Sequence, residues 1–201
     1  MKTKETDRIT PENEGLNLEL QSNLKLILNE NLRLSEKIDT ENLIPLIDSI
    51  NSAERIFLLA AGRSGYALRG AAMRLMHLGL NVFFVGDTTT PAIKKEDLLI
   101  IASGSGSTAS MVKAAEKGVA IGARVIAITT APESELSKLA YHTVLIPAAG
   151  KQDFDGNISE QYAGSLFEQF LFLLMDVVFQ SLWKLDGSPA EELWSRHANL
   201  E

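Results

Sequence analysis

Short apolar runs alternate with longer segments of helical periodicity through the middle of the chain. The runs that predict β-strands are residues 55–61, 81–85, 97–102, 124–129 and 143–146. Apolar positions spaced three and four apart predict the helices between them, over residues 64–79, 106–122 and 134–140. Strands that alternate with helices are typical of a parallel sheet covered on both faces. The pattern therefore predicts an α/β fold, a three-layer α-β-α sandwich around a five-stranded parallel sheet.

Both ends of the chain add segments outside this alternation. The predicted helices there are residues 18–37, 40–50, 160–185 and a short last helix opened by Ser188-Pro189. Residues 1–17 are polar and show no apolar period, which predicts a flexible tail. We therefore expect a tail over residues 1–17, followed by a single domain over residues 18–201.

The composition narrows the partners that the chain can take. Its 201 residues carry a formal net charge of −7, from 19 lysines and arginines against 26 aspartates and glutamates. A field of this sign discourages nucleic acid and anionic membranes as partners. No cysteine is present, which excludes disulfides, thiolate nucleophiles and cysteine-bound metals. Because the N-terminus also lacks the apolar run of a secretory signal, we expect a cytoplasmic protein.

One apolar stretch, residues 166–185, approaches the length of a membrane span. Charged and amide side chains interrupt it, so we expect a helix that is buried or lies at a subunit interface. The large apolar side chains of the last two helices are Phe167, Phe170, Phe172, Phe179, Trp183 and Trp194. Because one helix face does not need so many, we expect the chain to associate with copies of itself.

Two junctions between a predicted strand and a predicted helix are rich in glycine and serine. Gly62-Arg63-Ser64 follows the first strand, and Ser103-Gly104-Ser105-Gly106-Ser107-Thr108 follows the third. In an open parallel sheet, ligands bind beyond the carboxyl ends of the strands, where helix N-termini offer unpaired N–H groups to an anion. Glycines let the backbone approach closely, and hydroxyls donate to phosphate oxygens. We interpret residues 103–108, here called the serine turn, as a phosphate site, with Arg63 as a candidate to offset the phosphate charge.

Two other interpretations of these junctions compete with the phosphate site. Ordinary helix capping needs one hydroxyl, so it does not explain the four in the serine turn, whereas it explains Ser64 as well as ligand binding does. Gly104-x-Gly106-x-x-Ala109 fits the pattern of a dinucleotide site. The acidic residue expected about 20 positions further on is missing, because the next strand ends in Thr129-Thr130. We therefore expect no cofactor.

Several segments carry a resemblance to a known family. They are residues 61–65 (AGRSG), 72–79 (AMRLMHLG), 103–106 (SGSG), 164–168 (GSLFE) and 196–201 (RHANLE). With these segments the chain resembles the sugar isomerase (SIS) domain and, more narrowly, the 6-phospho-3-hexuloisomerase family. The resemblance implies a flavodoxin-like SIS domain, usually assembled as a homotetramer with sites shared between subunits.

The same resemblance implies a reaction and its setting. The reaction interconverts D-arabino-hex-3-ulose 6-phosphate and D-fructose 6-phosphate through a cis-enediol intermediate. It belongs to the ribulose monophosphate pathway of formaldehyde fixation, which implies a functional link to hexulose phosphate synthase. In the serine turn, Ser103, Ser105 and Thr108 would hold the phosphate. Ser107 stands where family members commonly carry glutamate, which bears on the fit of the substrate more than on phosphate binding.

Three further residues receive roles from the resemblance. Ser64 would reach the sugar, Glu168 would be the catalytic base, and His197 would reach the site of a neighbouring subunit. From helical spacing alone, Glu168 is explained better as a solvated helical glutamate, and His197 as a surface histidine near the chain end. The apolar neighbours of Glu168 would make its carboxylate a better proton acceptor.

The histidine spacing and the N-terminal segment provide evidence on metal binding and on the alternative functions. The three histidines lack the spacing of a metal site, so we expect no metal. A sugar-phosphate-binding SIS regulator without catalysis would keep the serine turn, but no basic helix-turn-helix fits before residue 50. An isomerase of another phosphosugar, a pentose or a heptose, is the third hypothesis.

Overall fold

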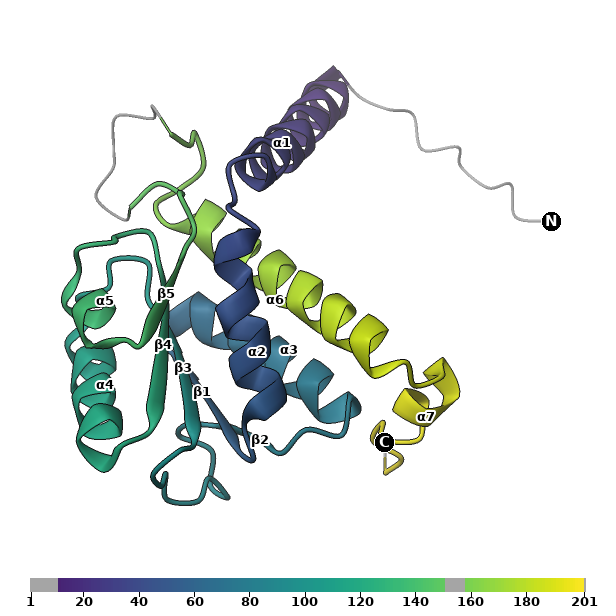
Figure 1. Cartoon of the computed structure of the whole chain (residues 1–201). Helices are drawn as coiled ribbons and strands as arrows, with labels where there is room; N and C mark the ends of the chain where they lie inside the picture. The colour runs from purple at the N-terminus through teal and green to yellow at the C-terminus, as the bar shows by residue number, and fades with distance from the viewer. Residues whose placement is uncertain (1–10, 151–157, 201) are drawn as a thin grey trace.

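The sheet of the domain is parallel throughout and its strand order reverses once (Figure 1). The computed structural model describes residues 11–150 and 158–200, and predictions for residues 1–10, 151–157 and Glu201 lie outside them. Within the described residues the strands are β1 (Ile56–Ala60), β2 (Val82–Phe84), β3 (Leu98–Ala102), β4 (Arg124–Thr129) and β5 (His142–Leu145). Their order is β2-β1-β3-β4-β5, the flavodoxin-like order. The predicted five-stranded parallel sheet is confirmed.

Helices cover both faces of this sheet (Figure 1). On one face lie α4 (Ala109–Ile121) and α5 (Glu135–Leu139). On the other lie α2 (Ile44–Ser52), α3 (Gly62–His77) and α6 (Ser165–Asp186). The predicted three-layer sandwich is therefore confirmed as well.

Alternate side chains of the strands enter two separate cores. Ile56 and Leu58 of β1 belong to the core that α2, α3 and α6 share, whereas Phe57 and Leu59 belong to the core beneath α4 and α5. Every residue of β1 and of β3 is buried. Strands buried on both faces read as continuous apolar runs, which explains why the sequence pattern identified them.

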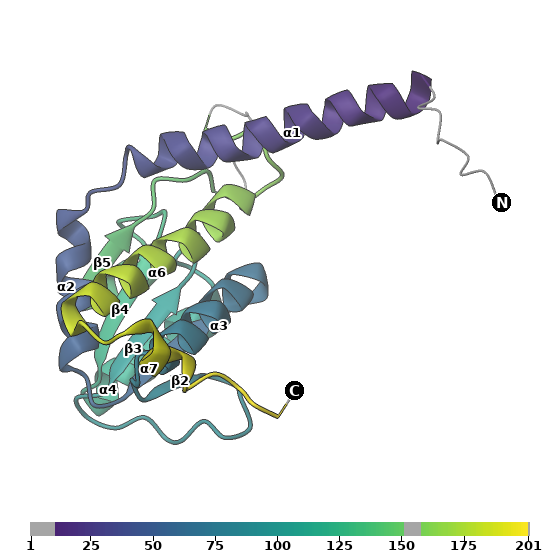
Figure 2. The same cartoon turned by 90° about the vertical axis from the view of Figure 1, so that its right-hand side faces the viewer.

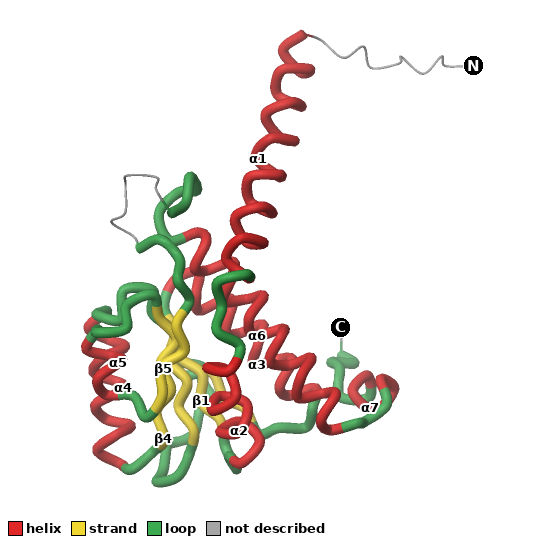
Figure 3. The backbone as a smooth tube through the Cα atoms, turned by 45° about the horizontal axis from the view of Figure 1, so that its top comes forward, coloured by secondary structure: helices red, strands yellow, loops and turns green. Residues whose placement is uncertain are grey.

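The N-terminal helix differs from its prediction. Helix α1 (Pro11–Ser35) projects from the sandwich, and only its C-terminal part lies against α6 (Figures 2 and 3). Residues 11–17, predicted as part of a flexible tail, are helical. The pattern missed them because Leu16 is the one large apolar residue among them, so they show no apolar spacing. Pro11 occupies the first helical position, where its missing N–H interrupts no helical hydrogen bond.

Helix α6 is long and apolar enough to cross a membrane by length and composition. In the structure it packs along α3, and Leu171, Leu174 and Val178 are buried in the shared core. The predicted burial of this helix is therefore confirmed. The remaining elements are the 3-10 turn η1 (Glu41–Leu43) before α2 and the short helix α7 (Ala190–Trp194) after α6.

Candidate active site

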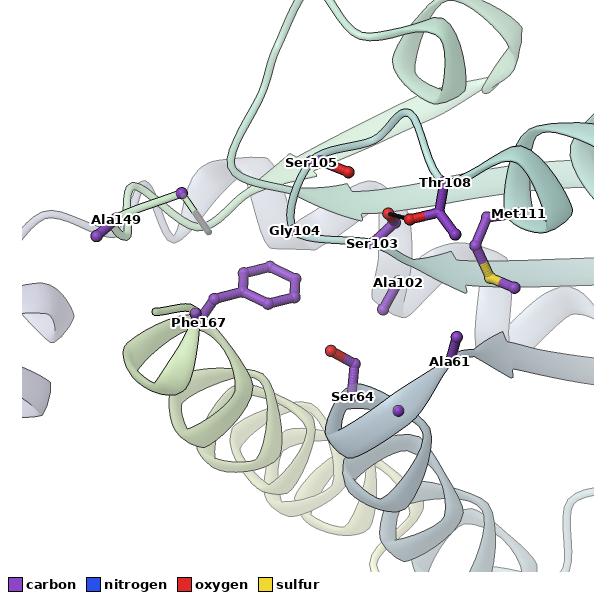
Figure 4. Close-up of a pocket in the computed structure, with 13 residues that line it drawn as sticks. Ala61, Ser64, Ala102, Ser103, Gly104, Ser105, Thr108, Met111, Ala149 and Phe167 are labelled. Carbon is purple, nitrogen blue, oxygen red and sulfur yellow. Dashed lines mark hydrogen bonds between the residues drawn. The ribbon is translucent and has the colours of Figure 1, made fainter. Parts of the chain in front are cut away.

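A cavity of about 110 Å³ lies beyond the carboxyl ends of β1 and β3 (Figure 4). These two strands flank the point where the strand order reverses, since β2 adjoins β1 and β4 adjoins β3. That point is where open α/β sheets bind their ligands. The residues that line the cavity come from both junctions, from the segment after β5 and from the start of α6, and include Gly62, Ser64, Ser103, Gly104, Ser105, Thr108, Gly164 and Phe167.

The serine turn is held in place by the last residue of β4 and by the segment that follows it. The carbonyl oxygen of Gly104 accepts hydrogen bonds from the Thr129 hydroxyl at 2.9 Å, the Thr130 hydroxyl at 2.9 Å and the Thr130 N–H at 3.1 Å. The carbonyl of Gly106 accepts from the Leu136 N–H at 3.0 Å. The two threonines that argued against a dinucleotide site thus fix the shape of the turn.

Gly106 is required by this shape. Its φ of +60° lies in the left-handed region, which ends the extended backbone and delays the start of α4 to Ala109, three residues after the predicted start. A Cβ atom at this position would lie 2.1 Å from the Ser134 hydroxyl oxygen. No side chain larger than hydrogen fits without moving α5.

The hydroxyls of the two junctions do not cap their helices. Thr108 is the N-cap residue of α4, but its side chain makes no capping hydrogen bond and instead lies 3.1 Å from the Ser103 hydroxyl. Ser64 lies inside the first turn of α3, whose N-cap residue is Ala61. Its hydroxyl has no hydrogen-bond partner among the described residues and points into the cavity (Figure 4). Capping therefore does not explain these side chains.

Three helix N-termini meet at the cavity, those of α3, α4 and α6. The backbone N–H groups of Ala109 and Ser110, at the start of α4, have no acceptor within the described residues. The helix dipoles place positive potential at these ends, and unpaired N–H groups are ready donors to an anion. The described residues that line the cavity include no lysine or arginine, so the donors that they offer to an anion are neutral.

Glu168 lies beside the cavity, in an adjoining groove of about 310 Å³ between α3 and α6. Its carboxylate Oε2 lies 3.2 Å from Nη1 of Arg63, and the same Nη1 donates to the Ser165 hydroxyl at 3.2 Å. The Glu168 side chain is 12% exposed, so the interpretation as a solvated helical glutamate is wrong. Its neighbour Phe167 lines the cavity, and Arg63 stands in the sequence between two cavity residues, Gly62 and Ser64. The groove with the carboxylate and the cavity are therefore formed by the same turns of α3 and α6.

Three residues expected at the phosphate do not line the cavity. Arg63 is 61% exposed and pairs with Glu168, a partner that the sequence did not suggest. Gly106 shapes the turn from outside the cavity, and Ser107 is exposed. Gly62, Ser64, Ser103, Gly104, Ser105 and Thr108 line the cavity as expected.

His197 lies at the opposite end of α3 from the cavity. Its ring stacks on that of His77, with 3.8 Å between the ring centroids. The Trp194 ring also contacts it in a tilted arrangement, with 4.6 Å between the centroids. Ser64 and His77 are 13 positions apart on α3, which corresponds to about 20 Å along the helix axis. Within one chain, His197 and the cavity are therefore far apart. Among the described residues, no group of three or more histidines and carboxylates could hold a metal ion.

Comparisons with known proteins give a consistent result. The sequence matches the SIS domain family over residues 49–163. It is 53% identical to the 3-hexulose-6-phosphate isomerase of Mycobacterium gastri, over 91% of this chain and 92% of that protein. It is 40% identical to the enzyme of the same name from Bacillus subtilis, over 87% of this chain and 95% of that protein. A crystal structure from Methanococcus jannaschii, for which the function of 3-hexulose-6-phosphate isomerase was inferred, is 35% identical with a TM-score of 0.78, covering 90% and 99% of the two chains.

Proposed function

The chain belongs to the SIS domain family and, within it, to the 3-hexulose-6-phosphate isomerases, and from this premise we propose how its site works. The enzyme interconverts D-arabino-hex-3-ulose 6-phosphate and D-fructose 6-phosphate. One observation carries the proposal: the helix turns that hold the Glu168 carboxylate also form a cavity lined by serine and threonine hydroxyls at helix N-termini.

The serine turn binds the phosphate. Ser103, Ser105 and Thr108 donate their hydroxyl hydrogens to phosphate oxygens, and the N–H groups of Ala109 and Ser110 complete the set. Hydrogen bonds to a charged group contribute more than those between neutral groups, about 1.5–3 kcal/mol each. Ser64, on the α3 side of the cavity, faces the sugar that extends from the phosphate.

Glu168 moves the proton between carbons. It removes the hydrogen of C2, the electron pair of that bond forms the C2–C3 double bond, and O3 takes a proton to give the cis-enediol. O2 then loses its proton, the carbonyl forms at C2, and the protonated Glu168 returns its proton to C3. One carboxylate on one face of the enediol can perform both transfers. Arg63 holds the carboxylate in place through Oε2.

A homotetramer with shared sites accounts for the exposed apolar surface. Leucines along α1, among them Leu18, Leu24 and Leu28, are more than half exposed. An apolar groove of about 390 Å³ runs between the C-terminal part of α1 and α6, where Leu173 and Val177 are also exposed. Packing against further copies would cover these surfaces. His197 then acts in the site of a neighbouring copy, where it shuttles the hydroxyl proton between O2 and O3.

The cellular setting follows from the reaction and the composition. The ribulose monophosphate pathway of formaldehyde fixation supplies the hexulose phosphate, and the synthase of that pathway is the functional partner. The absence of cysteine in the sequence is compatible with a cytoplasmic enzyme.

A coupled assay that follows fructose 6-phosphate tests the reaction. Purified protein is incubated with D-arabino-hex-3-ulose 6-phosphate, and arabinose 5-phosphate is offered in a parallel reaction. We expect turnover of the hexulose phosphate. Binding of sugar phosphate without turnover would favour the regulator, and preferential turnover of arabinose 5-phosphate would favour an isomerase of another phosphosugar.

A mixing experiment tests the shared sites. The Glu168→Gln and His197→Ala variants are each expected to lack activity as pure proteins. When the two are unfolded and refolded together, some mixed tetramers contain an intact Glu168 beside an intact His197 from another copy. We expect activity to return in the mixture, and sedimentation to show a tetramer. A mixture as inactive as its components would contradict the sharing.

A further inference from the structure

Glu30 of α1 is a buried carboxylate that the reaction does not use. It is 2% exposed, and within the described part of the chain its hydrogen-bond donors come from residues 159–161. Its oxygens accept from the Ser159 hydroxyl at 2.6 Å, the Glu160 N–H at 2.7 Å and the Gln161 side-chain amide at 2.9 Å. Burial by itself would raise the pKa of Glu30, but these hydrogen bonds outweigh it and the pKa is lowered. The group is therefore held as a carboxylate.

The contact between Glu30 and residues 159–161 is here called the clamp. A second set of hydrogen bonds extends from the clamp to α6. The Gln169 side-chain amide donates to Oε1 of Gln161 at 2.7 Å, and Asn31 of α1 donates to Oε1 of Gln169 at 2.9 Å. Gln169 directly follows Glu168 in the sequence. Residues 30 and 31 of α1 thus hold both the segment that leads into α6 and the helix at the position next to the proposed base.

The start of α6 is fixed by two buried side chains, Leu166 and Phe167, and by Arg63, which contacts Ser165 and Glu168, but it lacks a capping side chain. Its N-cap residue is Gly164, in the left-handed conformation with φ of +79°, and no side chain makes a capping hydrogen bond there. In the segment 158–164, Ser159 and Gly164 are the buried residues. Gly164 lines the cavity and Ser159 meets Glu30. The position of this segment therefore depends on the clamp.

We propose that Glu30 is a positioning residue, which holds the first turns of α6 so that Glu168 meets the sugar while the serine turn holds the phosphate. The inference rests on the proposed role of Glu168. The two parts of the site have different supports. The serine turn is fixed by Thr129 and Thr130, whereas the helix that carries Glu168 is held by α1 through Gln169, in addition to the Arg63 contact. Loss of the clamp should slow the proton transfer and leave phosphate binding intact.

The Glu30→Gln variant tests the proposal. A glutamine side chain has only one acceptor oxygen. Its NH2 group would face N–H and O–H donors whose hydrogen bonds the carboxylate accepted, so donor would meet donor. We expect kcat to fall by roughly tenfold to a hundredfold, the range expected when a catalytic group is misplaced by about 1 Å. The inhibition constant of inorganic phosphate, which reports on the serine turn, should stay within about twofold of the wild-type value. Unchanged kcat would overturn the proposal, and so would equal losses of kcat and phosphate affinity in a folded variant.

Asp97→Asn is the matched control. Asp97 is also a buried carboxylate, 6% exposed, and it accepts from Arg55 and from the Lys94 N–H at 2.6 Å. It precedes β3, at the amino ends of the strands and away from the cavity. We expect this variant to lose stability and keep its kcat. A fall in kcat as large as that of Glu30→Gln would mean that general destabilisation explains both, which would overturn the inference.

Two further measurements keep the test decisive. If Glu30→Gln fails to fold, Ser159→Ala removes a single donor to the clamp, and an unchanged kcat in that variant would overturn the proposal. On a Glu168→Gln background, Glu30→Gln should cause no further loss, because Glu30 acts through Glu168. Wild-type protein without turnover would defeat the proposed function itself, whereas active wild type with an equally active Glu30→Gln would defeat this inference alone.

Discussion

Arg63 and Glu168 join the N-terminal turns of α3 and α6, with 3.2 Å between Nη1 and Oε2. The pair lines a groove between these two helices, and the sequence neighbours Ser64 and Phe167 line the cavity. A reaction that needs a phosphate anchor and a base a short distance away can use this arrangement.

Replacing Glu168 should separate binding from catalysis. In Glu168→Gln the amide cannot accept the C2 proton, so we expect kcat to fall by roughly 10²- to 10⁴-fold, the contribution of general base catalysis. The affinity for fructose 6-phosphate, measured by calorimetry, should stay near the wild-type value. As a companion, Arg63→Met keeps the aliphatic stem and loses the guanidinium, and should lower kcat less. A Glu168→Gln variant with substantial activity would show that another residue is the base.

The serine turn should control affinity. Ser105→Ala removes a hydroxyl that lines the cavity, and we expect the dissociation constant for inorganic phosphate to rise roughly tenfold, as expected from about 1.5 kcal/mol for a hydrogen bond to a charged group. Ser107→Ala is the control, because Ser107 belongs to the same turn but is exposed and outside the cavity. Calorimetric titration should show weaker binding for the first variant and unchanged binding for the second. Equal effects would mean that the turn as a whole, rather than its cavity-facing hydroxyls, sets the affinity.

Gly106→Ala should damage the turn itself. A left-handed φ costs a residue with a Cβ about 1–2 kcal/mol, and the added Cβ would also meet Ser134 at 2.1 Å. We therefore expect a clear fall in the melting temperature together with loss of phosphate binding. Gly187→Ala makes a good comparison, because φ there is +75° but nothing lies within 4 Å of the added Cβ. If both variants lose the same stability, the contact with Ser134 has no effect.

The sheet was predictable because its central strands are buried on both faces. β1 and β3 appear in the sequence as unbroken apolar runs, and glycine and serine directly after them mark the site. Residues 11–17 were not predictable as helix, since Leu16 is their one large apolar residue and shows no period. The cavity could be located from the sequence for the same local reason, because many of its lining residues directly follow β1 and β3.

The contacts that position the base could not be predicted. Arg63 and Glu168 are distant in the sequence, and Glu30 lies 129 positions from Ser159. Sequence spacing carries no signal for such pairs, because each residue type is common on helix surfaces. Only the fold shows that Glu30 is buried and that its donors belong to the segment before α6.

His77 should make the stability of the domain depend on pH. The residue is 3% exposed, its Nδ1 has no hydrogen-bond partner among the described residues, and His197 stacks on its ring. Burial lowers the pKa of His77 below its ordinary value of 6.5, and the neighbouring His197 and Arg74 lower it further. The unfolded chain therefore binds a proton at His77 more readily than the folded chain does. Stability from this group is complete above pH 6.5 and is lost as the pH falls from there towards the folded pKa.

Thermal melts of the wild type between pH 7.5 and 5.5 should show this loss as a falling melting temperature. His77→Phe keeps an aromatic ring against His197 but cannot take up a proton, so its melting temperature should fall less over the same range. Arg74→Gln keeps the histidine and removes one nearby positive charge, and should give an intermediate slope. Equal slopes for wild type and His77→Phe would show that other groups cause the pH dependence. A smaller slope in His77→Phe would instead establish that the stacked pair at the end of α3 weakens the fold in acid.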